Sequence, residues 1–168
     1  MEEKIDFQVP VFPFNLTSQD GQALLIAYSN IYPNNGVPRF NKTYWDSEVK
    51  VCNTIFPHCI EMHPMMDNPS TCVFTLPAGS IRIKCKFGMA KQNTKPDASG
   101  DFTGTILVNG NIIWSGNVKG TTCAAQLHDI DILFTGVPPF TQIEFKVNPN
   151  GRYEADHAVW LAPTLYNV

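Results

Sequence analysis

The chain has 168 residues, of which 43% are apolar and only 16% are charged. That length fits a single domain, and the apolar content excludes overall disorder. The 12 basic and 15 acidic side chains give a formal charge of −3, which argues against a nucleic-acid binder with a basic surface. No apolar run approaches the roughly 18 residues that a membrane span requires.

The N-terminus, from Met1 to Asp6, has no basic region, apolar stretch or cleavage site, so the sequence predicts no signal peptide. The five cysteines are an odd number, which fits poorly with a closed disulfide framework. We therefore expect reduced thiols in a cytoplasmic chain, with non-classical secretion left open. The glycosylation triplets at Asn15 and Asn41 are then interpreted as coincidence.

The first third of the chain is irregular. Residues 21–28 give the best helix signal, although the same stretch also fits a buried strand. Residues 32–38 are rich in turn formers, and a strand is expected near Glu48 to Cys52.

From residue 71 onward the apolar side chains alternate with polar ones, which is typical of strands with one buried face. The expected strands are 71–76, 81–87, 103–108, 112–114, 128–134 and 142–147. Asn109-Gly110 is a favoured two-residue hairpin turn, and Lys91 to Asp101 is predicted to be an exposed loop. On the second strand, one face carries Ile81, Ile83, Cys85 and Phe87 and the other carries Arg82, Lys84 and Lys86.

About eight short strands without helices must bury their apolar faces against one another. The sequence therefore predicts an all-β fold, a two-sheet antiparallel β-sandwich with jelly-roll connections. The Cys-Trp-Cys spacing of an immunoglobulin domain is missing. We expect one domain over residues 1–168, with residues 1–20 as an N-terminal arm or first strand.

The C-terminal sequence 156–165 resembles the Asp-His-Ala-x-Trp-x-x-x-x-Leu ending of the NPCBM (novel putative carbohydrate-binding module) family. Residues 104–115 are similar to the Gly-rich hairpin of that family. Ile60 to Pro64 are similar to its Gly-Ile-x-x-His step, and Phe87-Gly88 to its Val-Gly pair. The four blocks span residues 48–168 in the family's order. The resemblance implies a galactose-binding-domain-like sandwich, a glycan ligand and calcium as a conceivable cofactor. The chain departs from the pattern at Cys59, Val159 and Leu161.

Carbohydrate binding requires an aromatic platform and a few fixed donors and acceptors. Tyr44 and Trp45 lie in a polar segment with Arg39, Asn41 and Asp46, and they could bind a sugar or pack on the sandwich edge. His63, beside the loop of residues 65–68, is a second candidate.

The resemblance adds Asp156, His157 and Trp160 to the candidate ligand-binding residues. From the residues alone, Asp156 and His157 also fit hydrogen bonding of loop amides, and both Trp160 and Trp114 fit burial in the core. The row of Arg82, Lys84 and Lys86 fits a solvated strand face, or contact with an acidic partner or an anionic sugar.

Other site chemistry is weaker. Cys52, His58, Cys59 and His63 have zinc-binding donors, but their spacing matches no common zinc motif. Neighbouring residues on a strand face opposite ways, which argues against a Cys59–His58 dyad, and no catalytic site is predicted.

We therefore expect a non-catalytic, lectin-like module that recognises a glycan or glycoprotein, with a galactose-type sugar favoured by the resemblance. The alternative is a structural or protein–protein interaction module on the same fold, without sugar binding. Homo-oligomers are compatible with either function. A coat-protein jelly roll is disfavoured by the acidic first six residues.

Overall fold

The computed structural model describes residues 11–33, 36–65, 68–80, 82–92, 94–95, 97–134, 137–151 and 156–167. The expectations for residues 1–10, Met66, Asp67 and Ile81 fall outside these residues. The described residues form one short helix, α1 (Gln19–Gln22). The strands are β1 (Phe14–Asn15), β2 (Leu25–Ser29), β3 (Arg39–Phe40), β4 (Val49–Val51), β5 (Thr54–Phe56), β6 (Cys59–Met62), β7 (Ser70–Thr75), β8 (Arg82–Met89), β9 (Gly100–Val108), β10 (Asn111–Gly120), β11 (His128–Leu133), β12 (Gln142–Pro149) and β13 (Ala158–Tyr166).

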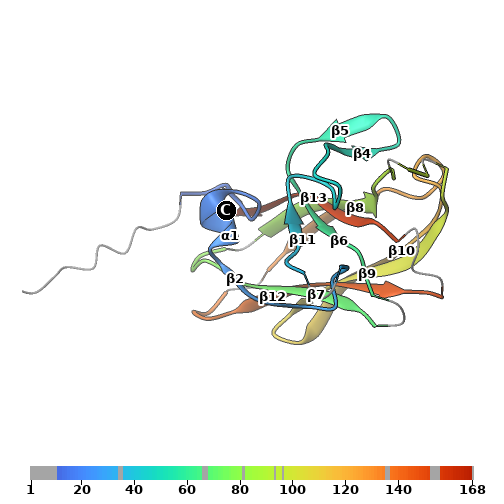
Figure 1. Ribbon diagram of the computed structural model, residues 1–168. Helices are drawn as coiled ribbons and strands as arrows, with labels where there is room; N and C mark the ends of the chain where they lie inside the picture. Colours follow the sequence, from blue (N-terminus) through green and yellow to red (C-terminus); the bar gives the residue numbers. More distant parts are fainter. Residues whose placement is uncertain are drawn as a thin grey trace, which may run out of the picture.

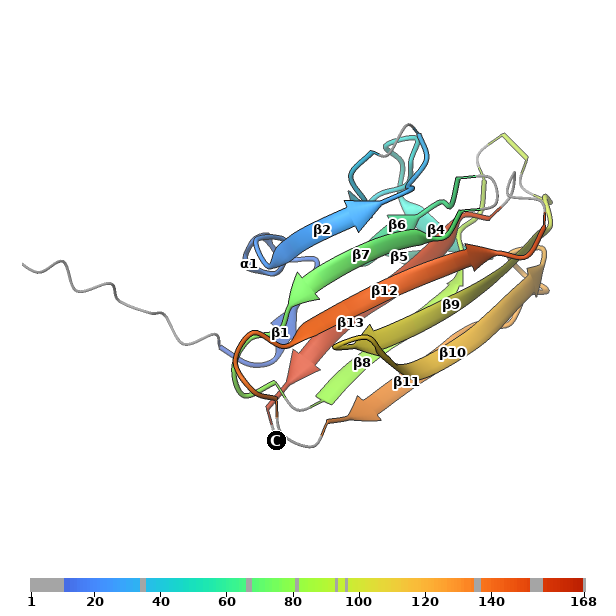
Figure 2. The same cartoon turned by 90° about the horizontal axis from the view of Figure 1, so that it is seen from below.

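Two antiparallel sheets pack face to face (Figures 1 and 2). One has the order β11-β8-β13-β6-β3, with β1 pairing to β13 as well, and the other has the order β10-β9-β12-β7-β2. The β4–β5 hairpin forms a separate two-stranded sheet. The all-β, two-sheet jelly-roll prediction is confirmed. No helix in the described residues is long and apolar enough to cross a bilayer.

The core lies between the sheets because each strand turns its alternate apolar residues inward. Aromatic rings fill its centre: Trp160 lies 4.2 Å from Phe87 and 5.0 Å from Phe145 between ring centroids. Trp160 has no exposed surface, so its predicted burial is confirmed, and Trp114 is only partly buried against the same core. The alternation predicted for residues 71–76 and 142–147 is confirmed by the buried faces of β7 and β12.

The expected β9–β10 hairpin is present. Its turn residues Asn109 and Gly110 both have positive φ, 47° and 81°, as a tight two-residue hairpin requires. Further along β9, the position of Gly104 leaves no room for a side chain. A Cβ there would lie 2.3 Å from Cε1 of Phe87, so the bare backbone lets the two sheets approach.

Residues 21–28 do not form one helix. The helix ends at Gln22, and β2 begins at Leu25 because Leu24 and Leu25 pack against the core as an edge strand on β7. The α1 N-terminus is capped by the Ser18 hydroxyl, which accepts a hydrogen bond from the Gly21 amide at 3.1 Å.

The basic row on β8 faces solvent beside the acidic row of β11. Arg82 donates two hydrogen bonds to Asp131, at 2.6 and 2.7 Å, and Lys86 pairs with Asp129. Asp131 also lies 3.8 Å from Lys84. The solvated-face interpretation of this row is therefore confirmed, and the acidic partner it contacts lies within the same chain.

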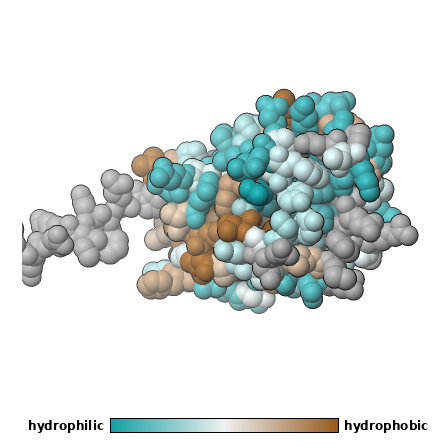
Figure 3. All heavy atoms as spheres, in the orientation of Figure 1, coloured by the Kyte–Doolittle hydropathy of each residue, from teal (hydrophilic) through white to brown (hydrophobic). Residues whose placement is uncertain are grey.

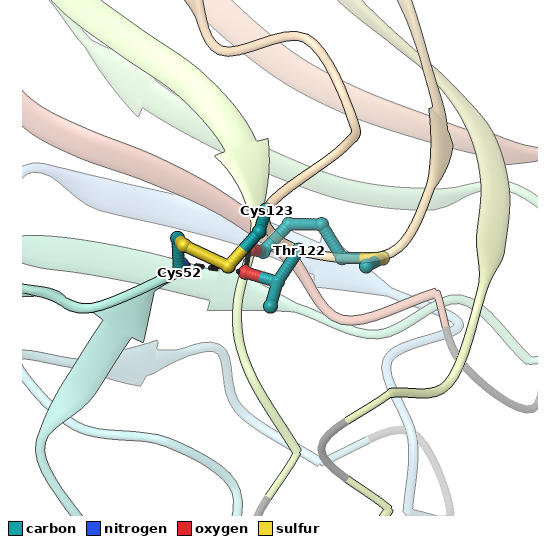
Figure 4. Close-up of a disulfide and its surroundings, with 4 residues drawn as sticks. Cys52, Thr122 and Cys123 are labelled. Atoms are coloured by element: carbon teal, nitrogen blue, oxygen red, sulfur yellow. Dashed lines mark hydrogen bonds between the residues drawn. A yellow bond between two sulfur atoms is a disulfide. The ribbon is translucent and has the colours of Figure 1, made fainter.

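The expectation of five reduced thiols is wrong for two of them. Cys52, in the β4–β5 turn, forms a disulfide with Cys123, in the loop after β10 (Figure 4). The Thr122 hydroxyl joins the same segments, since it accepts from the Cys52 amide at 2.8 Å and donates to the Met89 carbonyl at 2.9 Å. An odd number of cysteines therefore did not exclude one disulfide. Cys59, Cys72 and Cys85 are free and buried, as expected.

A second apolar cluster lies on the outer face of the β8-β13-β6 region. Cys59 on β6 and Val159 on β13 are buried there beneath Val49 and Val51 of β4. The residues between β3 and β4 and the β4–β5 hairpin thus cover this outer face. These segments bury part of the outer face of the sheet, and the candidate site lies beside this buried part.

Candidate functional site

The strand pairing of β6 and β13 places three polar side chains on the same outer face. Val159 is paired with Glu61 and Ala158 with Met62, so residues 61 and 63 of one strand and 157 and 159 of the other share a face. Glu61, His63 and His157 are all buried, with exposures of 2%, 5% and 3%.

A cavity of about 320 Å³ opens at this point. It brings together four of the six candidate residues named from the sequence: Tyr44, Trp45, His63 and His157. The remaining lining residues are Tyr32, Gln92, Thr94 and Lys95. The cavity is therefore built from a loop before β3, the segment after β3, the ends of β6 and β8, and the start of β13.

The five aromatic rings that line the cavity also pack against one another. The centroid distances are 5.4 Å from Tyr32 to Tyr44, 5.2 Å from Tyr44 to Trp45 and 4.7 Å from Trp45 to His157. His157 then lies 4.4 Å from His63, which lies 5.3 Å from Tyr32. Each ring packs against two others, so the wall of the cavity is preformed.

The turn that carries Tyr44 and Trp45 is held by hydrogen bonds between side chains and backbone amides. The buried Thr43 hydroxyl accepts hydrogen bonds from the amides of Trp45 and Ser47, both at 3.2 Å. The Asn41 side chain accepts from the Cys59 amide at 3.2 Å and so ties the turn to β6. The platform is thus fixed on the sheet rather than left as a free loop.

The charged residues expected beside this platform interact with one another. Asp46 lies 2.9 Å from Lys42 and 3.4 Å from Arg39, and the Lys42 ammonium holds the pKa of Asp46 below its usual range. Arg39 and Asp46 are largely exposed and do not line the cavity. Of the polar residues predicted near Tyr44 and Trp45, none forms part of the cavity wall.

Hydrogen bonds orient both histidines. The Nδ1 of His63 lies 2.8 Å from the Pro64 carbonyl, which only accepts, so this nitrogen carries the proton and donates. The Nδ1 of His157 lies 3.1 Å from Oε1 of Glu61. Burial lowers the pKa of both imidazoles to about 4, so both are neutral near pH 7.

Nothing in the sequence identified Tyr32 as a residue of the site. It follows the bridge between Ile31 and Pro64, and its amide donates to the His63 carbonyl at 2.8 Å. Glu61 was also missed, although its position two residues before His63 on the same strand was a usable signal. The segment 92–95 was expected only as an exposed loop, but Gln92 is buried at the cavity.

Two of the sequence-predicted residues lie outside the cavity. Asp156 is buried, and its Oδ1 accepts a hydrogen bond from the Asp101 amide at 2.9 Å, so it bonds a backbone amide as considered for it, but one that belongs to β9 and not to a loop. Burial raises the pKa of Asp156 to about 6. Trp160 belongs to the core, so neither side chain lines the cavity.

The zinc hypothesis loses one of its four ligands, because the Cys52 sulfur is bonded to Cys123. Within the described ranges, no three His, Cys, Asp or Glu side chains lie together as a metal would need, which applies to calcium as well. His58 is exposed whereas Cys59 is buried, and burial raises the pKa of the Cys59 thiol to about 12. The predicted separation of these two side chains is confirmed.

The chain matches no protein-family model and no curated protein sequence. Solved structures with the same fold are carbohydrate-binding modules of family 51 (CBM51). One, from the GH95 protein of Clostridium perfringens in complex with methyl-galactose, is 12% identical, with a TM-score of 0.69. That match covers 90% of this chain and 98% of the module.

Two further matches come from C. perfringens ZmpB. Its CBM51-2 and INT domains, solved with GlcNAc, are 14% identical with a TM-score of 0.65, over 85% of this chain and 30% of that one. The structure of its M60 catalytic domain with CBM51-1 and CBM51-2 is 16% identical with a TM-score of 0.66. The match covers 85% of this chain but only 14% of that much longer one. At these identities the comparisons establish the galactose-binding-like sandwich fold.

Proposed function

We propose that the chain is a non-catalytic carbohydrate-binding module that recognises a glycan or glycoprotein through the cavity bounded by the five rings. The observation that carries this proposal is the cluster of five mutually packed rings, Tyr32, Tyr44, Trp45, His157 and His63, that lines one preformed cavity. Aromatic faces accept the apolar C–H surface of a sugar ring, and fixed polar groups select its hydroxyls. CBM51 modules of the same fold, solved with methyl-galactose and GlcNAc, support a galactose-type or GlcNAc-type ligand.

The NPCBM family stays part of the proposal. His63 and His157 belong to two of the blocks that resemble the family. Their rings lie together at the cavity, with 4.4 Å between the centroids. Blocks that are 94 positions apart in the sequence thus contribute to one wall, as a shared ligand site would require.

Isothermal titration calorimetry with methyl galactoside and GlcNAc tests the function. We expect Trp45→Ala to weaken binding about 30-fold, because truncating a buried aromatic anchor costs about 2 kcal/mol. Tyr166→Ala is the matched control, since Tyr166 lies on β13 away from this cavity. The absence of saturable binding to a glycan array by the folded protein would contradict the proposal.

The alternative, a protein-interaction function, is favoured by one surface. Figure 3 shows apolar side chains gathered over β2. This strand is the edge of its sheet, Ile26 is 51% exposed, and no charged residue occurs from Gly21 to Pro38. Edge strands are usually protected by charges, which would also repel a second copy of the same strand. We propose that a second copy of this chain pairs here through β2, an interaction that requires no sugar binding.

Sedimentation equilibrium tests this pairing. We expect a dimer that Ile26→Lys converts to a monomer, whereas Ile112→Lys, at a 67% exposed position on the opposite edge strand β10, leaves it dimeric. A wild-type chain that stays monomeric at millimolar concentration would rule the pairing out.

The cytoplasmic location remains a prediction, but the Cys52–Cys123 disulfide argues for a different compartment, because cytosolic thiols are kept reduced. We propose that the protein works in an oxidising compartment. Thiol labelling of the protein from its native source, without reductant, should leave Cys52 and Cys123 unlabelled. Labelling of both would restore the cytoplasmic expectation.

A further inference from the structure

Glu61 is a buried carboxyl group that lies beside the cavity wall rather than in it. Its Oε1 lies 3.1 Å from Nδ1 of His157, and the two side chains are 1% and 4% exposed. Its Oε2 is buried without a hydrogen-bond partner in the described part of the chain. A charged carboxylate with one unpartnered oxygen in such a place would be costly, because burial disfavours the ionised form.

The groups around Glu61 do not provide a strong compensating charge. His63 and His157 are both neutral near pH 7, because burial lowers their pKa values. Arg39, paired with Glu61 in the β3–β6 register, is 40% exposed and bonded to Asp46. Six titratable or charged groups face Glu61 from the surrounding elements. They are Cys59 and His63 at β6, His157 at β13, Arg39 on β3, Tyr44 in the turn after β3, and Lys95 on the far side of the cavity.

Burial raises the pKa of Glu61 to about 8, against smaller lowering effects from the Tyr44 amide, His63 and Arg39. Near neutral pH the pair is thus a carboxylic acid beside a neutral imidazole. The acid has one proton to donate and Nδ1 of His157 has the lone pair to accept it. The imidazole then carries its own proton on Nε2.

We infer that Glu61 is a positioning residue: as a neutral acid, it holds His157 in the Nε2–H form, so that the cavity offers a hydrogen-bond donor at this point to an oxygen of the bound glycan. The inference rests on the proposed glycan-binding function. His63 has the opposite arrangement, because its Nδ1 donates to the Pro64 carbonyl and its Nε2 carries the acceptor lone pair. The two imidazoles thus differ in tautomer, although both are neutral.

Loss of the Glu61 proton reverses this arrangement. A carboxylate can only accept, so the His157 proton moves from Nε2 to Nδ1 and Nε2 becomes an acceptor. The glycan oxygen then faces a lone pair instead of a donor. Glycan binding is therefore expected to weaken in the alkaline range, whereas titration of an ordinary histidine would weaken it in acid.

Glu61→Gln separates this role from simple packing. The Gln amide has nearly the same shape and can donate to Nδ1 of His157 as the neutral acid does, but it has no proton to lose. We expect the variant to keep the Nε2–H form of His157 at every pH. Asp156→Asn is the matched control, because Asp156 is also a buried acid with a raised pKa but bonds to the Asp101 amide.

The first measurement needs no ligand. Long-range ¹H–¹⁵N NMR of the full chain, with His157 assigned by His157→Gln, distinguishes Nε2–H from Nδ1–H directly. We expect Nε2–H at pH 6.5 in the wild type, conversion to Nδ1–H above about pH 8, and no conversion in Glu61→Gln. Nδ1–H in the wild type at pH 6.5, or conversion in both proteins alike, would overturn the inference.

The second measurement is the affinity for methyl galactoside or GlcNAc by calorimetry. If only the protonated acid supports binding, affinity falls about tenfold from pH 7 to pH 9 in the wild type and in Asp156→Asn. In Glu61→Gln it changes less than twofold. If the NMR signals of His157 behave as expected but neither sugar binds, the proposed function is contradicted and the role of Glu61 is still supported. Binding that falls equally in wild type and Glu61→Gln would contradict the role of Glu61 and leave the function standing.

Discussion

At the scale of single residues, the cavity depends on side chains that are buried without carrying a charge. Glu61, His63 and His157 lie together under 6% exposure each, and the surrounding protein favours the neutral form of all three. Neutral groups keep their directional hydrogen bonds, and they avoid the desolvation cost of isolated charges.

This cluster predicts a stability profile against pH. The folded pKa of Glu61, about 8, is higher than its ordinary 4.5, so folding favours the protonated acid and stability falls as pH rises toward 8. The two histidines, lowered from 6.5 to about 4, have the opposite effect between those values. Above pH 6.5 only the Glu61 contribution of this cluster remains, with a slope of up to about 1.4 kcal/mol per pH unit. Urea unfolding at pH 6.5, 7.2 and 8.0 should show this decline in the wild type and not in Glu61→Gln; parallel curves would contradict it.

Gly104 provides a second residue-scale prediction. Gly104→Ala should destabilise the fold by about 1 to 3 kcal/mol, because its Cβ would lie 2.3 Å from the Phe87 ring in a filled core. Gly88→Ala is the control, since its Cβ would meet the flexible end of Leu127 at 2.8 Å and Val51 at an ordinary contact distance of 3.9 Å. The urea unfolding midpoints of the two variants, compared with that of the wild type, measure both losses of stability. An equal or larger loss in Gly88→Ala would show that the Phe87 contact is not the limiting one.

At the scale of elements, the cavity is made by segments that are held over the outer face of a sheet. The turn with Tyr44 and Trp45 is tied to β6 through Asn41, and the β4–β5 hairpin is tied to the loop after β10 through Cys52–Cys123. The hairpin covers Val159 and Leu161 of β13, directly beyond His157. The elements that cover the outer face thus support the site from the side.

The disulfide gives the element-scale prediction. It closes 71 residues of chain, so its loss should destabilise the protein by about 2 to 4 kcal/mol through the freedom returned to the unfolded state. Urea unfolding of a Cys52→Ser, Cys123→Ser double variant, beside the wild type with and without reductant, measures this. Reductant should have no further effect on the double variant. A wild type that is insensitive to reductant, and as stable as the double variant, would contradict the assignment.

Alternation of side chains made the elements after residue 70 predictable. On β8 and β12, buried apolar residues recur at every second position, among them Ile83 and Phe87 on β8 and Phe145 on β12. Only a pleated strand puts residues with this spacing on one buried face. Before residue 70 the strands are two to five residues long, too short for a period to appear. The stretch 21–28, which fitted both a helix and a buried strand, is divided between the end of α1 and the strand β2.

The candidate site was predictable only where chemistry and local sequence agree. Tyr44, Trp45 and His63 were named from aromatic and polar character and His157 from the family resemblance, and the four do meet at one cavity. Tyr32 reaches it through a bridge between residues 31 and 64, a pairing that no local pattern encodes. The partner of Cys52 is equally non-local, since only the folded chain brings Cys123 to it.

At the scale of the whole molecule, one jelly-roll sandwich has a filled aromatic core and, on one outer face, a second set of rings that lines a cavity. Trp160 and Phe87 serve packing, whereas Trp45 and His157 border open space. The fold is shared with CBM51 modules at 16% identity or less, so the ligand of this chain depends on its own cavity residues.

The most direct test of the account is a ¹H–¹⁵N correlation titration of the chain with methyl galactoside and with GlcNAc. With the Trp45 indole signal assigned by Trp45→Phe, at least one sugar should shift that signal saturably while the buried Trp160 indole stays in place. Saturable shifts that leave Trp45 untouched and move the β8 and β11 amides instead, or no shifts at all, would contradict a glycan site bounded by these five rings.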